Sequence, residues 1–241
     1  MAEPETKSVE AKKSSGFDFS KTLKESFDTI KSVFVKPATS DNKKFADVKT
    51  AGIFAGFAAV IYLVVELISA IIQTVVTKSC ENISFSTMSC SSYKTKVDFN
   101  NLNNFDFFKT LGNDVLTLVG IVAVVAIVVY VMGLIFKKQP KFMKLVAITT
   151  AGLAPFFAAS FISTIVAYIW TPLAVFVIFA GMVATFAYII NAVSKEIVLE
   201  GDKKIFFHIV SIVVMFIVAY FILTSIAKDS AAGAYIKLLG L

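Results

Sequence analysis

One carboxylate stands inside a long apolar stretch of the sequence, where an ionised group is costly. Glu66 occupies the middle of the run IYLVVELISAII. If this run crosses a bilayer, a charge at its centre costs at least about 2.5–3.5 kcal/mol on insertion scales. We therefore expect Glu66 to face other helices. It is either a contact for an ion, a proton or a solute, or a carboxyl hydrogen-bonded to Ser or Thr of a neighbouring helix.

Few other residues could carry chemistry. The chain holds two cysteines, Cys80 and Cys90, and one histidine, His208. A metal site or a thiol-based catalyst has almost nothing to build with. The sequence also lacks a nucleotide-binding glycine loop, a Ser/His/Asp set and an HExxH motif. We expect no enzyme activity, no cofactor, no metal and no nucleic-acid partner, and a structural role for His208.

Both cysteines fall in a polar segment, 77–114, that is rich in Ser and Asn. If this segment faces an oxidising compartment, Cys80 and Cys90 can close a small loop, and the alternative is a pair of free thiols. We favour the disulfide. It would fix the loop and would not act in catalysis, because no Cys-x-x-Cys motif is present.

The amino-acid composition indicates the class of protein to which the chain belongs. Apolar residues make up 57% of the 241 residues and charged residues only 17%. A soluble domain has about 45–50% apolar and about 25% charged residues, and it cannot hide this excess of apolar surface. The sequence therefore predicts an all-α integral membrane protein.

Five apolar stretches are long enough to cross about 30 Å of hydrocarbon as helices. Trp170 and Pro172 mark a tight turn between the third and the fourth. We expect a transmembrane domain over 48–227, a bundle of five transmembrane helices with approximate spans at 51–76, 115–136, 145–169, 173–193 and 205–227.

The distribution of Lys predicts the orientation of the spans. Ten Lys precede the first span, four lie in 137–144 and three in 194–204, which is 17 of the 23 in the chain. Cytoplasmic loops carry the excess of positive charge. We therefore expect a cell-membrane protein with a cytoplasmic N-terminus. The loop 77–114 and the tail 228–241 would lie outside the cytoplasm.

The N-terminal part divides into two segments. Residues 1–16 are polar and are expected to be disordered. In 17–36 the apolar residues recur every three or four positions, and Lys and Asp fall away from their stripe, which predicts an amphipathic helix in the membrane interface. The alternative is a helix packed on the rest of the protein or on a partner. The stripe consists of Phe19, Leu23, Phe27, Ile30 and Phe34.

Small residues indicate where helices pack, because they let backbones approach closely in lipid. Gly52 and Gly56 form a Gly-x-x-x-Gly pair in the first span, and Pro155 is expected to kink the third. Packing within one chain is the first interpretation, and association of further copies is the alternative. The alanine stripes are Ala147, Ala151, Ala154 and Ala158 on the third span, and Ala180, Ala184 and Ala187 on the fourth.

These features together resemble the Yip family, the Ypt-interacting membrane proteins, in its bacterial branch. The resemblance covers roughly residues 27–227. It rests on a lead-in ending IKSVFVKP, on the order of five spans with a long first external loop, and on the segment KFMKLVAITTAGLAPFFAASFIS. Eukaryotic members carry an Asp-Leu-Tyr-Gly-Pro-type segment before the first span, to which only Pro37 corresponds here. This departure argues against a small-GTPase partner.

The resemblance implies a five-helix membrane fold without catalytic residues. From the sequence we expect a non-enzymatic membrane organiser or adaptor whose N-terminal segment recruits partners or anionic lipid. Its partners are the lipid bilayer and other membrane proteins or further copies of the chain. The alternative is a permease for small solutes or ions that uses Glu66.

Overall fold

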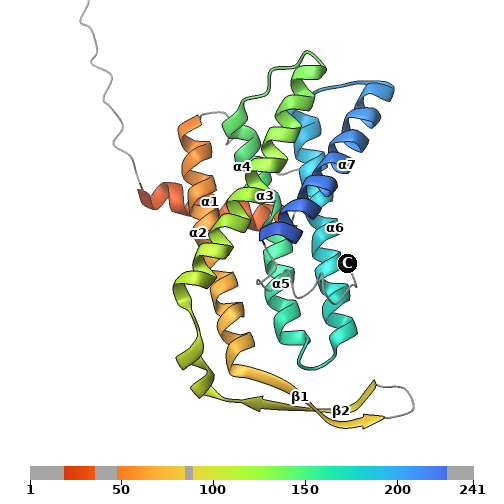
Figure 1. The fold of residues 1–241 in the computed structure, drawn as a ribbon. Coiled ribbons are helices and arrows are strands. Elements are labelled where there is room, and N and C mark those ends of the chain that lie inside the picture. Colours follow the sequence, from red (N-terminus) through yellow and green to blue (C-terminus); the bar gives the residue numbers. More distant parts are fainter. Residues whose placement is uncertain (1–18, 36–47, 85–88, 227–241) are drawn as a thin grey trace, which may run out of the picture.

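The computed structural model describes residues 19–35, 48–84 and 89–226. Long helices account for most of them, and a single β-hairpin extends from one end of the bundle (Figure 1). The expectations for 1–16 and 228–241 lie outside the described residues. The elements are α1 (Phe19–Val35), α2 (Val48–Val75), β1 (Val76–Ser84), β2 (Ser89–Val97), η2 (Phe99–Asn104), α3 (Phe107–Ile135), α4 (Phe142–Gly152), α5 (Ala154–Val166), α6 (Thr171–Glu196) and α7 (Gly201–Ile226).

Four helical stretches of the described chain are long and apolar enough to cross a membrane. They have 25 to 29 residues, which is about 38–44 Å at 1.5 Å per residue. The class predicted from composition, an all-α membrane protein, is therefore confirmed at this level. The stretches are Lys49–Val75, Phe107–Ile135, Phe142–Val166 and Thr171–Glu196. The fifth expected span falls on α7, which packs against α3.

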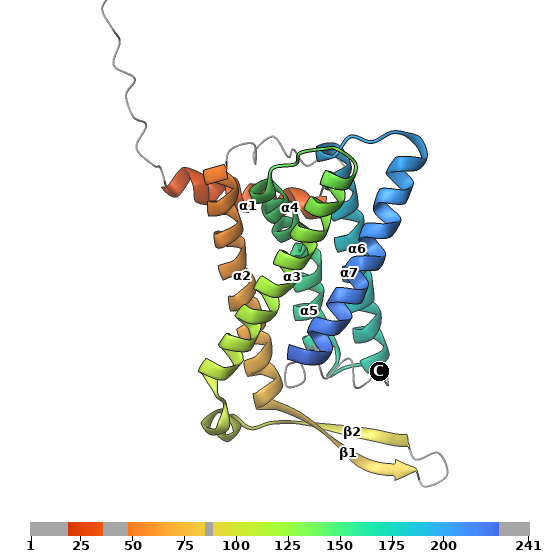
Figure 2. The same ribbon diagram turned by 45° about the horizontal axis from the view of Figure 1, so that its top comes forward.

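Helix α1 crosses the bundle rather than running along it (Figure 2). It contacts α2, α4 and α5. Ser26, Thr29 and Val33 are buried in this contact, whereas Phe27 and Phe34 of the predicted apolar stripe are about half exposed. The helix therefore docks on the bundle through a face of small and β-branched residues, and the apolar stripe lies along the edge of this contact.

The segment 77–114 is more structured than the loop expected from its polarity. Strands β1 and β2 form an antiparallel hairpin, and η2 and the first two turns of α3 complete the segment. Helix α3 starts at Phe107 and not near Val115, because Asp106 caps it by accepting a hydrogen bond from the Lys109 amide (3.0 Å). Asn113 and Asp114 therefore lie inside α3, in its second turn.

The hairpin register pairs Cys80 with Tyr93 and Cys90 with Ile83. The two cysteines are thus not register partners. Nothing in the described structure tests the disulfide, which stays a prediction.

The third expected span is divided between α4 and α5, which meet at Leu153. Pro155 lies in the first turn of α5, where proline is tolerated, and because it has no amide hydrogen to donate to α4, the helical hydrogen bonds are not continuous across the break. Beside this break the Tyr62 hydroxyl of α2 donates to the Thr150 carbonyl (2.8 Å). The Tyr62 ring also stacks on Phe157, with 4.4 Å between the ring centres. A side chain of a neighbouring helix thus stabilises the interruption.

The glycines at close helix contacts are not the predicted pair. A Cβ atom added at Gly181 would overlap the Ala159 side chain, and one at Gly152 would overlap Ile189. Around Gly56 there is no atom within 4 Å of such a Cβ, so the expected packing of this residue within one chain is wrong. Gly52 makes an ordinary contact with Met143.

Of the two alanine stripes predicted to pack, one is buried and the other is exposed. Ala147, Ala151 and Ala154 are buried and Ala158 is half-buried, as packing of the third span requires. The stripe expected to pack on α6 is exposed: Ala180, Ala184 and Ala187. The buried face of α6 instead includes Gly181, Thr185 and Tyr188. Helix α6 is therefore rotated relative to the orientation that its alanines suggested.

Candidate functional site

Glu66 lies on the side of α2 that faces the bundle, and it is half-buried. The Ser160 hydroxyl of α5 is within hydrogen-bonding reach of its carboxyl. The same carboxyl lines a pocket that is bounded by α2, η2 and the start of α3. Both interpretations of Glu66 from the sequence, a contact with a neighbouring Ser and a ligand contact, are therefore compatible with its position.

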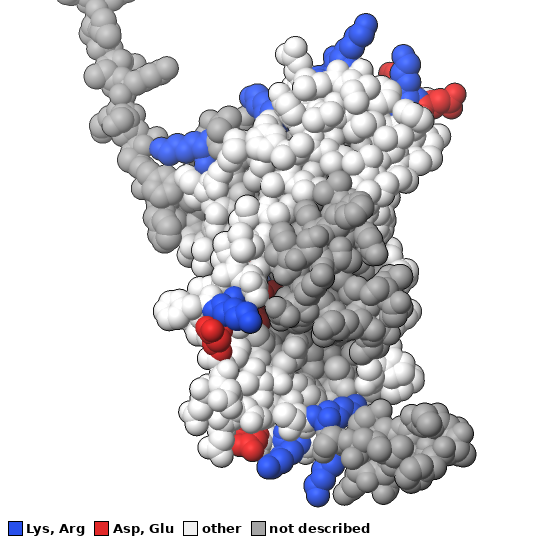
Figure 3. Space-filling model, viewed as in Figure 1, with Lys and Arg blue, Asp and Glu red and all other residues white. Residues whose placement is uncertain are grey.

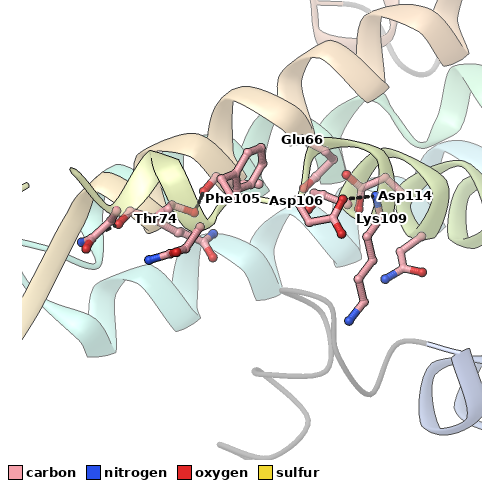
Figure 4. Close-up of a pocket in the computed structure, with 12 residues that line it drawn as sticks. Glu66, Thr74, Phe105, Asp106, Lys109 and Asp114 are labelled. Carbon is pink, nitrogen blue, oxygen red and sulfur yellow. Dashed lines mark hydrogen bonds between the residues drawn. The ribbon is translucent and has the colours of Figure 1, made fainter. Parts of the chain in front are cut away.

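The pocket has a volume of about 580 Å³, and all of its described lining residues except Ala70 and Phe105 have polar side chains. Figure 4 shows Thr74 and Phe105 toward one end and the carboxyls of Glu66, Asp106 and Asp114 gathered toward the other. The lining residues are Glu66, Ala70, Gln73 and Thr74 of α2, Asn101 and Asn104 of η2, Phe105 and Asp106, and Lys109, Thr110, Asn113 and Asp114 of α3.

Hydrogen bonds hold η2 against the end of α2, and η2 thereby forms one wall of the pocket. The Asp98 amide donates to the Val75 carbonyl (2.9 Å), and the Asn101 side-chain amide donates to the Thr74 carbonyl (3.2 Å). The Asn100 amide donates to the Asp98 carboxyl (3.1 Å). This bond, with a weaker contribution from Lys96, holds the pKa of Asp98 below its usual range.

The charges around the pocket do not balance. Three acidic residues line it, and Lys109 is the one basic residue among the described lining residues. The Lys109 side chain points away from the carboxyls in Figure 4. The carboxyls of Glu66 and Asp114 come from different helices and line the same pocket. The pocket therefore favours a positively charged occupant.

The described residues of the pocket are not arranged as a metal site. Within the described residues, no group of three His, Cys, Asp or Glu side chains is arranged to hold one. The acidic residues of the pocket thus share a cavity without converging on a point. The hydrogen-bond acceptors of the pocket are instead distributed over a volume larger than that of a single ion.

The opposite end of the bundle holds a second set of polar contacts. Lys144 of α4 forms an ion pair with Glu196 of α6, and each side chain is only 15% exposed. The His208 ring of α7 is hydrogen-bonded to the Ser194 hydroxyl (2.7 Å). These contacts join neighbouring helices, and we assign them a structural role. The Lys144–Glu196 pair could not be predicted, because the sequence placed Glu196 in the connection after the fourth span, whereas α6 continues to this residue.

The sequence analysis also missed most of the pocket. Of the lining residues, the sequence marked Glu66 alone as a candidate for a functional contact. The available signal was helical spacing: Glu66 and Gln73 are seven apart, as are Asp106 and Asn113, so each pair shares a helix face. That the two faces meet could not be read from the sequence.

Comparison with known proteins places the chain in a family. The model of the Yip1 domain matches residues 31–226, which include all of the pocket and every helix from α2 to α7. No curated protein and no solved structure gives a significant match. A match that covers most of the chain, on a bundle of membrane-spanning helices, shows that this protein belongs to the Yip family.

Proposed function

We propose that the protein is a non-enzymatic organiser or adaptor of a bacterial cell membrane, with α1 lying in the cytoplasmic interface. The observation that carries this proposal is the division of α1 into three faces. With 3.6 residues per turn, three adjacent stripes run along the helix. They are the buried docking face (Ser26, Thr29, Val33), an apolar flank (Leu23, Phe27, Ile30, Phe34) and a charged flank (Lys24, Asp28, Lys31).

Such a helix suits the boundary between lipid and water beside a membrane bundle. One face packs on the protein, the apolar flank reaches toward the acyl chains, and the charged flank reaches toward water. The Phe27 ring contacts the Phe57 ring of α2 in an edge-to-face arrangement, with 5.4 Å between the ring centres. The charged flank, exposed at Lys24 and Lys31, is then the surface available to partners or anionic lipid.

The proposal includes a fifth span formed by α7. This helix has 26 residues, about 39 Å in length, and packs along α3. Large apolar side chains on its described part are exposed, which suits lipid contact. They are Ile205, Phe206, Ile209, Val213, Phe216 and Ile217.

The proposed orientation has the N-terminus and the connections 136–141 and 197–200 in the cytoplasm. Lys side chains cluster in and beside these connections, as positive-inside topology requires. Figure 3 shows charged side chains gathered at the two ends of the face drawn, with a largely uncharged surface between them that a small charged group interrupts. That uncharged zone is where the acyl chains would lie.

Site-specific photo-crosslinking in cells tests the organiser role. A crosslinking residue at Lys24 or Lys31 should capture other proteins or anionic lipid, and the same residue at buried Val33 should react within the chain. Deleting residues 1–36 should remove those partners from a pull-down. An identical partner set with and without the segment would contradict the proposal.

A second function, a permease for small solutes or ions, is favoured by one observation: Glu66 lines a polar pocket within the bundle. Purified protein in liposomes would then carry a flux that the change Glu66→Gln abolishes. If no flux is measured, or if the flux is the same in the variant, this second function fails and the organiser role is unaffected.

A further inference from the structure

We propose that the pocket between α2 and α3 binds a primary ammonium group. Its volume of about 580 Å³ lies within the range of about 300–1,000 Å³ that is usual for small-molecule sites. The volume leaves room for more than the ammonium itself. The inference concerns binding alone and depends neither on the organiser role nor on transport.

The charge of the occupant follows from the carboxyls. Glu66 and Asp114 face the same cavity from two helices, and no basic side chain turns toward them in Figure 4. The Ser160 hydroxyl, within hydrogen-bonding reach of Glu66, can satisfy one of its acceptor sites. A carboxylate has about four lone-pair sites, so acceptor capacity remains for a ligand. A cation placed between the two carboxyls would be attracted by both.

The type of cation follows from the rest of the lining. Gln73, Asn101 and Asn113 add amide oxygens to the carboxyls, whereas Phe105 is the one aromatic residue among the described lining residues. A primary ammonium has three N–H donors that such acceptors can satisfy. A quaternary ammonium has none and is bound by aromatic cages, which this pocket does not form.

Two sources can supply this chemistry. A free amine would enter from water on the hairpin side, where η2 forms the rim of the pocket. A phospholipid with an ethanolamine headgroup would enter from the bilayer, beside the exposed apolar side chains of α3 at Leu116 and Val119. The ammonium and its acceptors are the same in both cases, so one experiment with two arms separates the sources.

The experiment uses the full-length protein. In the first arm, ethanolamine or choline is titrated into protein in detergent, and binding is followed by calorimetry. In the second arm, the protein is placed in nanodiscs that contain phosphatidylethanolamine or phosphatidylcholine, and native mass spectrometry counts the retained lipids. We expect ethanolamine, or the ethanolamine lipid, to bind about tenfold or more tightly than its choline counterpart, as the loss of charge-assisted hydrogen bonds implies.

Two variants test the assigned residues. Glu66→Gln and Asp114→Asn keep the side-chain shape and remove the charge, and each should weaken binding by about tenfold or more. Glu200→Gln, an exposed change in the 197–200 connection at the other end of the bundle, is the matched control and should leave binding unchanged. Unaltered thermal unfolding of each variant shows that the fold is intact.

Binding in either arm that requires Glu66 and Asp114 supports the inference and names the source. The inference is overturned if neither ethanolamine nor the ethanolamine lipid binds, if choline binds as well, or if the two acid variants bind like the control. Transport measured in the same preparations would change none of these outcomes.

Discussion

The contact between α5 and α6 and the contact between α2 and α3 are built in opposite ways. At Gly181 the first is so close that a Cβ atom would overlap Ala159 and lie 3.1 Å from the Pro155 carbonyl oxygen. The second leaves an open pocket of about 580 Å³ that is lined mainly by residues with polar side chains. Lipid gives no hydrophobic drive for helix association, so close packing of small residues has to supply the stability. The less closely packed side, between α2 and α3, can then hold charged groups such as Glu66 and Asp114.

The difference indicates that one side of the bundle provides stability and the other provides a binding site. The packed side, from α4 to α6, acts as the scaffold, and the Lys144–Glu196 ion pair joins two of its helices. The open side keeps Glu66 and Asp114 without a basic partner among the described lining residues, an arrangement that favours binding over stability. Substitutions on the packed side should therefore affect unfolding most, and substitutions on the open side should affect it least.

The largest effect on unfolding is expected for Gly181→Ala. The added Cβ has no space, and overpacking of this kind costs about 2–3 kcal/mol. Denaturant unfolding in detergent measures the change. Gly56→Ala is the control, because that position is open and a surface change is worth about 0.5 kcal/mol or less. Equal effects of the two substitutions would remove the distinction between the packed and the open helix faces.

A smaller loss of about 2 kcal/mol is expected for Lys144→Met. The change leaves Glu196 charged and only 15% exposed. Breaking a fully buried pair costs about 3–5 kcal/mol, and the residual exposure reduces that figure. The double variant Lys144→Met, Glu196→Met should recover at least half of the loss in the same unfolding assay. A double variant as unstable as the single one would show that the pair does not act as a unit.

The smallest effect is expected on the open side, for Asp106→Ala. The change removes the hydrogen bond from the Lys109 amide to the cap of α3, which is worth about 1 kcal/mol. Hydrogen exchange should rise in the first turn of α3 and stay unchanged in α5 and α6. Faster exchange throughout the bundle would mean that the open side also carries the global stability.

The sequence predicted what depends on local composition. Apolar length located the four helical stretches that can cross a membrane, Pro155 marked the break between α4 and α5, and residues 30–35 of the lead-in fell on α1. The family resemblance, too, is confirmed, and the Yip1 domain covers 31–226 against the expected 27–227.

What the sequence could not predict depends on which helix faces meet. Ala180, Ala184 and Ala187 look like a packing stripe, but α6 turns Gly181 toward α5 instead. Helix α1 appeared to have two faces, and Ser26 and Thr29 form a third because the bundle offers a docking surface. The pocket needs the polar faces of two helices and the position of η2, none of which is encoded in a local pattern.

Cysteine accessibility in whole cells tests the central claim most directly, namely that the α2–α3 side opens outward while the α5–α6 side is closed. In a background without Cys80 and Cys90, single cysteines replace Thr110 in the pocket and Ala159 at the packed contact. A membrane-impermeant maleimide should label position 110 in intact cells and should leave position 159 unlabelled even after the membrane is permeabilised. Equal labelling of the two positions, or labelling of position 110 only after permeabilisation, would contradict the account.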